Sequence, residues 1–109
     1  MAIGDGEDIL ASDILGLVSF EITVGNTHSL TTVADQKVIV FARAVQNGNP
    51  STATLAYNGV TKDSFSGANG ANADVPIILT YMETPGAGTE DITVTGSQAV
   101  IVVIKLNQA

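Results

Sequence analysis

The stretch LVSFEITV, residues 17–24, alternates strictly between apolar and polar side chains. Every second residue from Val18 to Val24 is apolar, and the residues between them are polar. In an extended chain, successive side chains point to opposite faces, so this pattern places all the apolar residues on one face. Residues 17–24 are therefore predicted to form a half-buried β-strand.

Similar strand-like segments recur along the rest of the chain. We expect further strands at HSLTTV (28–33), KVIVFARAV (37–45), STATLAYNGV (51–60), VPIILTYME (75–83), DITVTG (91–96) and QAVIVVIKL (98–106). The Thr-rich segment 28–33 has the character of an edge strand. Segments 37–45 and 98–106 carry apolar residues on both faces, and for 37–45 this predicts a central strand covered on both sides.

Turn-forming residues separate these segments. Asn-Gly pairs occur at 47–48 and 58–59, and SFSGANGANAD (64–74) is mostly Gly, Ala and Asn, which predicts an exposed loop. No helical period is present apart from one short turn expected near 9–15. We therefore predict an all-β protein: a single antiparallel β-sandwich, of jelly-roll or immunoglobulin-like type, with about seven or eight strands. Residues 1–16 are predicted to form an N-terminal arm and residues 17–109 the sandwich domain.

The composition bears on the class of partner. The 109 residues include 4 basic and 11 acidic side chains, for a net charge of −7, and the basic ones are scattered singly. Nucleic acid and anionic membranes are therefore unsuitable partners. Only 14% of residues are charged and 45% are apolar, which favours a surface covered by another protein; the alternative is a monomer with a neutral, hydroxyl-rich surface.

No catalytic motif is evident. The single histidine, His28, has Ser29 and Asp35 nearby in sequence, but such residues are common in any β protein. The acidic pairs 7–8 and 90–91 are adjacent in sequence, so in a strand their side chains would point to opposite faces rather than flank a sugar. We expect no enzymatic activity and no cofactor.

Metal binding has little support. The absence of cysteine excludes both disulfides and thiolate metal sites. Four oxygen-bearing side chains flank the Gly-rich loop and leave a Ca²⁺ site as an open alternative: Asp63, Asn69, Asn72 and Asp74. Because the ordered acidic spacing of a calcium loop is absent, no metal is predicted.

Residues 52–106 resemble a β-sandwich module of phage and bacterial surface proteins. The resemblance lies in TLAYNGV (54–60) and ILTYMETPGAGTEDITVTGSQAVIVVIKL (78–106), although Tyr81 stands alone where a Trp or Tyr pair is usual and the chain has no Trp. At the start of the chain, GDGEDILASD (4–13) is similar to the phrase GDxIxASDxN that begins many tailed-phage virion proteins. The usual Asn is missing here.

These resemblances imply a tailed-phage virion structural protein, of the capsid decoration or cement type. It would bind the major capsid protein on the outer surface of the head and stabilise contacts between capsomers as a homo-oligomer, with a trimer favoured. It would be made in the host cytoplasm without export. The apolar residues of the arm, Ile9, Leu10, Ile14 and Leu15, are the expected contacts with a neighbouring subunit. The arm could instead form an edge strand of its own domain.

A tail or fibre module that recognises a host receptor is the alternative function. Its contact surface would be the loop 64–74, with Phe65, Asn69 and Asn72 as candidate contacts. The loop lacks the Tyr, Trp and Arg side chains that dominate binding hot spots.

Overall fold

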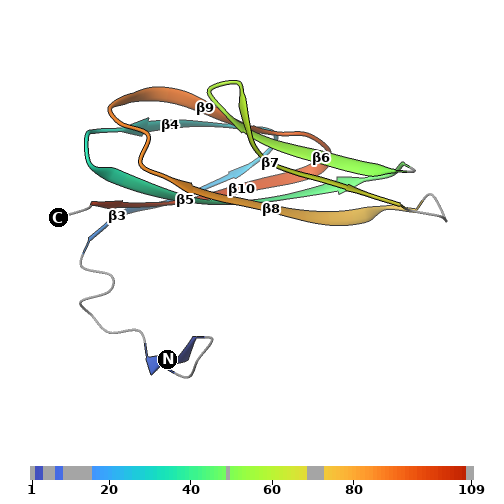
Figure 1. The fold of residues 1–109 in the computed structure, drawn as a ribbon, viewed down its shortest axis with the longest axis horizontal. Coiled ribbons are helices and arrows are strands. Elements are labelled where there is room, and N and C mark those ends of the chain that lie inside the picture. Colours follow the sequence, from blue (N-terminus) through green and yellow to red (C-terminus); the bar gives the residue numbers. More distant parts are fainter. Residues whose placement is uncertain (1, 4–6, 9–15, 49, 69–72, 108–109) are drawn as a thin grey trace.

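The chain folds as an all-β sandwich, as the sequence predicts. The structure, a computed structural model, describes residues 2–3, 7–8, 16–48, 50–68 and 73–107. Two four-stranded antiparallel sheets stack face to face, and this part of the chain contains no helix (Figure 1). A hairpin of two very short strands, β1 (Ala2–Ile3) and β2 (Glu7–Asp8), belongs to neither sheet.

Each sheet combines strands that are distant in sequence. The first sheet has the order β3 (Leu17–Val24), β10 (Ser97–Asn107), β5 (Gln36–Gln46) and β8 (Val75–Glu83). The second has the order β4 (Thr27–Thr32), β9 (Gly88–Val94), β6 (Ser51–Tyr57) and β7 (Val60–Gly67). The edge position of β4 and the internal position of β5 agree with the sequence predictions.

The strands pair in a nested pattern. Among the eight strands of the sandwich, the first pairs with the last (β3 with β10), the second with the seventh (β4 with β9), the third with the sixth (β5 with β8) and the fourth with the fifth (β6 with β7). A long hairpin rolled up in this way is a jelly roll. Of the two sandwich types that the sequence allows, the structure is therefore the jelly roll and not the immunoglobulin type.

The hydrophobic core lies between the two sheets. Its fully buried large side chains come from both layers: Leu30, Leu55 and Ile92 from the second sheet, and Leu79 and Ile101 from the first. Burying each such side chain stabilises the fold by about 1.5–3 kcal/mol. The core is thus a mainly aliphatic layer between the two inner faces, with Tyr57 buried in it and Tyr81 packed against it.

Polar contacts join the two sheets where β7 of the second sheet approaches β8 of the first. Asp63 on β7 accepts a hydrogen bond from the backbone N–H of Thr80 on β8 (2.9 Å), and Lys62 forms an ion pair with Glu83 (3.0 Å). At the β3–β4 turn, the side-chain amide of Asn26 donates to the carbonyls of Val94 (2.7 Å) and Gly96 (2.9 Å). These contacts connect the two sheets where β7 approaches β8 and at the β3–β4 turn.

The loop predicted at residues 64–74 begins later than expected. Residues up to Gly67 belong to β7, where Ser64 pairs with Thr54 and Ser66 with Thr52 of β6. Backbone pairing does not depend on apolar side chains, so a strand forms here in spite of the Gly- and Ser-rich sequence. Residues 69–72 lie outside the described part of the chain.

Candidate functional site

The first sheet presents an unusually apolar surface to the outside. We define the outer face as the side of β3, β10, β5 and β8 that points away from the second sheet. Its apolar members are Val18, Phe20, Ile22, Val24, Ile39, Phe41, Ile78, Met82, Val100, Val102 and Ile104. Eleven large apolar side chains are exposed in the described part of the chain, and seven of them lie on this face, each 43–84% exposed. Soluble monomers rarely expose so many together.

The orientation of β3 is the reverse of that in a usual sandwich strand. Its apolar side, from Val18 to Val24, faces solvent, while Ser19, Glu21 and Thr23 point toward the second sheet. The prediction that β5 is covered on both sides is also wrong, because Phe41 on its outer side is exposed. The outer face is built from apolar residues that periodicity alone would assign to a core.

A closed set of polar contacts holds the inner side of β3. Glu21 accepts hydrogen bonds from Ser19 (2.6 Å) and from Nε2 of His28 (3.0 Å), while Nδ1 of His28 lies 2.7 Å from the Thr23 hydroxyl. Lys105 on β10 lies 3.5 Å from Glu21 and donates to the carbonyl of Thr31. A neutral imidazole with its proton on Nε2 satisfies both contacts, donating to Glu21 and accepting from Thr23. The set provides a physical reason for β3 to turn its polar side inward.

Glu21 couples this set to pH. Burial disfavours its charged form, but the hydrogen bonds from Ser19 and His28 and the charge of Lys105 outweigh burial and lower the pKa of Glu21 below 4.5. Since the folded-state pKa is depressed, the stabilising contribution of Glu21 is fully present above pH 4.5 and is lost as the pH falls through and below that value.

We expect Glu21→Gln to weaken the acid sensitivity of the fold. The free energy of unfolding of the wild type should fall more steeply between pH 6 and pH 3 than that of the variant, and the variant should be less stable at pH 7 by about 1–2 kcal/mol. Urea unfolding at a series of pH values measures both effects. Glu90→Gln on β9, where no such set of contacts surrounds the carboxylate, is the matched control. Parallel pH profiles for the wild type and Glu21→Gln would contradict the prediction.

His28 is not arranged with the residues that its sequence neighbourhood suggests. Its partners are Thr23 and Glu21, not Ser29 or Asp35. The chain of hydroxyl, imidazole and carboxylate resembles part of a catalytic triad, but the imidazole is only 8% exposed. These contacts join β3 of the first sheet to β4 of the second and are best explained as structural.

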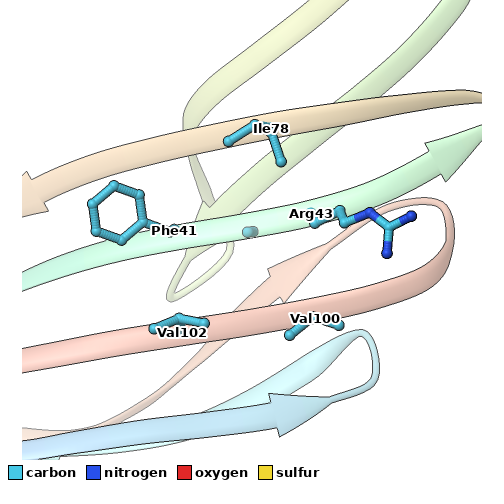
Figure 2. A pocket seen from close by; sticks show the side chains of 6 residues that line it. Phe41, Arg43, Ile78, Val100 and Val102 are labelled. Atoms are coloured by element: carbon cyan, nitrogen blue, oxygen red, sulfur yellow. The ribbon is translucent and has the colours of Figure 1, made fainter.

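A shallow hollow lies on the outer face. It has a volume of about 210 Å³ and is lined by Phe41, Ala42, Arg43, Ile78, Val100 and Val102. Figure 2 shows Phe41 and Arg43 diverging along β5, with Ile78 on one side and the two valines of β10 on the other. The hollow forms because small valines on β10 lie beside the gap between two long side chains on β5. It could accept an apolar side chain of a partner protein.

The charges of the first sheet are distributed unevenly between its two sides. Its four strands contain two acidic residues, Glu21 and Glu83, and both form ion pairs with lysines through contacts away from the outer face. Lys37 and Arg43 are the charged residues on the outer side of these strands. In a chain with a net charge of −7, a large surface free of carboxylates is well suited to close contact with another protein.

The structure places only part of the site predicted from sequence. Phe65 lies on β7 and is exposed, whereas Asn69 and Asn72 lie outside the described residues. The predicted arm contacts also lie outside that part of the chain: Ile9, Leu10, Ile14 and Leu15. The segments 37–45 and 98–106, with apolar residues on both sides, carry the sequence signal for the outer face. Periodicity alone assigns such residues to a buried core.

The calcium alternative gains no support from the side chains described. Asp63 uses both carboxylate oxygens in hydrogen bonds to the backbone N–H groups of Ser64 and Thr80, and Asp74 accepts from the side chain of Asn47 (3.0 Å). Within the described ranges, no three His, Asp or Glu side chains gather closely enough to hold a metal ion.

The comparisons with known proteins found no family model, no curated protein and no solved structure that matches the chain. No helix in the described residues is long and apolar enough to cross a membrane. Function must therefore be inferred from the chain itself, and its most distinctive feature is the outer face.

Proposed function

We propose that this protein is a non-enzymatic structural protein of a virion, specifically a capsid decoration (cement) protein of a tailed phage. It binds the outside of the head and stabilises contacts between capsomers. The observation that carries the proposal is the outer face, which combines seven exposed large apolar side chains with the absence of carboxylates from that side of its strands. A surface of this kind belongs to a protein that functions inside an assembly.

The fold and the charges are consistent with a place on the outside of a capsid. Jelly rolls recur in viral capsid domains, which is support by analogy of fold only. Lys62 and Lys105 are paired with Glu83 and Glu21, and the remaining cations of the sandwich do not form a patch suited to packaged DNA. An acidic protein is better placed on the outer surface of the head.

The proposed attachment uses the arm, residues 1–16. The point where the arm leaves the sandwich is fixed, because the carbonyl of Gly16 accepts a hydrogen bond from the backbone N–H of Asn107 (2.7 Å) at the end of β10. A Cβ atom at residue 16 would lie 2.8 Å from the Asn107 carbonyl oxygen, so a glycine is needed for this close approach. The apolar residues of the arm would bind the major capsid protein. Repeated binding over the capsid lattice would give stable attachment from modest individual affinities.

Receptor recognition through the 64–74 segment is supported less well. The ring of Phe65 lies over Gly67, where an added Cβ would come within 2.6 Å of it. The aromatic ring therefore packs along its own strand. The segment 64–74 also lacks the Tyr, Trp and Arg side chains that dominate binding hot spots.

Co-sedimentation with phage heads tests the proposal. The purified full chain should bind saturably to expanded heads of the phage that encodes it and should raise the temperature at which those heads release DNA. Host cells of that phage serve as the comparison. Binding to cells together with no binding to heads would favour the recognition module and overturn the decoration role.

A further inference from the structure

We propose that the occupant of the outer face is a second copy of this chain, packed face to face about a two-fold axis. This inference rests on the proposed function, in which another protein covers the outer face, and it identifies that protein. The arm then remains free to bind the capsid, so that each of the two surfaces has one partner.

The size of the outer face matches the needs of a stable dimer. Its seven most exposed side chains include two phenylalanines, and aromatic side chains carry about 150–250 Å² each. At exposed fractions of 43–84%, these side chains leave on the order of 700 Å² of apolar surface open, close to the roughly 800 Å² per partner of a standard protein interface. The half-buried valines and isoleucines between them extend the same surface.

The chemistry of the face favours an identical partner. Homodimer interfaces are more apolar than interfaces between proteins that also exist apart, which are about as polar as ordinary surface. Two copies each carry a net charge of −7 and repel each other in general. The outer side of these strands lacks carboxylates, so the two molecules can approach there without placing acidic groups against each other. The cations of this face, Lys37 and Arg43, have long side chains that can extend their charged ends to the rim of the interface.

The face carries a row of large apolar side chains beside a hollow. The row crosses the sheet, since Ile104 pairs with Phe20 and with Ile39, and Ile39 pairs with Met82. The hollow beside Phe41 lies next to this row on the same face. In the proposed dimer, rotation by half a turn about an axis between row and hollow would place the row of each copy over the hollow of the other.

This geometry predicts a dimer instead of the trimer expected from the resemblance. A single patch that contacts itself is isologous and closes with two copies, whereas a trimer needs two different patches on each copy. Among the described residues of the chain, none covers the face.

Light scattering of the purified full chain at micromolar concentration tests the proposal. The expected mass is that of two 11.1 kDa chains. Ile22→Glu and Phe20→Glu on β3 should each raise the dissociation constant at least about 100-fold, because both copies would bury an unpaired carboxylate. Both side chains are more than half exposed in the single chain, so the variants should retain the fold, as checked by circular dichroism.

Val60→Glu on β7 is the matched control. Val60 is as exposed as Ile22 (57% against 58%) but lies on the second sheet, so this variant should remain a dimer. If a glutamate variant fails to fold, Ile22→Ser and Phe20→Ser provide the same comparison without a charge. A monomeric or trimeric wild type, dimeric face variants, or a monomeric control would each overturn the proposal. No capsid is present in this assay, so a negative result leaves binding to heads intact as a separate test of the proposed function.

Discussion

A chain in which Ile101 is replaced by Asp is expected to be unfolded at 25 °C and neutral pH. Ile101 is fully buried on β10, a strand with neighbours on both sides, and its side chain belongs to the core between the sheets. The substitution removes buried methyl groups, worth about 2–5 kcal/mol, and adds an unpaired buried carboxylate, which costs several kcal/mol more. Together these losses approach the whole stability of a typical domain, about 5–15 kcal/mol.

The measurement is circular dichroism combined with urea unfolding. Val60→Asp introduces the same charge at an exposed apolar position and should change the free energy of unfolding by less than about 1 kcal/mol. If Ile101→Asp unfolds cooperatively at the same urea concentration as the wild type, the inner side of β10 is not part of the core.

Removal of residues 1–15 is expected to weaken binding to phage heads at least about 100-fold. The four apolar residues predicted as contacts would each contribute about 1–2 kcal/mol to binding when buried. Retention of Gly16 preserves its hydrogen bond with Asn107, and all the strand pairs of the sandwich lie beyond the deletion. The truncated chain should therefore fold normally and lose only attachment.

Co-sedimentation with expanded heads at increasing protein concentration measures this effect. A full-length chain with Ser at positions 9, 10, 14 and 15 is the matched control, because it keeps the length and acidity of the arm while removing its apolar groups. It should bind as weakly as the truncated chain. Undiminished binding by either variant would rule out the arm as the attachment device.

The sequence predicted the fold class because most of its strands carry the ordinary signals. The turn at 58–59 joins β6 to β7, and the Thr-rich segment containing Leu30 forms an edge strand as expected. The nested pairing was not derivable, since strand periodicity says which face of a strand is apolar but not which distant strand lies beside it. The sequence does not predict the strand β7, because backbone pairing sustains it through Gly67 without an apolar pattern.

The candidate site was harder to predict because an apolar interface and an apolar core have the same pattern. Residues such as Phe20 and Ile22 alternate with polar residues as if they faced a core. What decides their direction is the environment of Glu21, whose hydrogen bonds from His28 and Ser19 come from one side only. His28 follows β3 in sequence, and no local sequence pattern predicts that its imidazole contacts the Glu21 carboxylate between the two sheets.

The nested pairing also determines when the protein can fold during its synthesis. β10 is the last strand of the sandwich in chain order, yet it lies between β3, the first, and β5. The first sheet therefore cannot close until β10 has left the ribosome, and the chain must carry its apolar strands uncovered until then. Contacts between such distant segments also slow folding relative to helical proteins of similar size. The partly made chain is thus the species most exposed to aggregation, and its first sheet forms only after translation of β10.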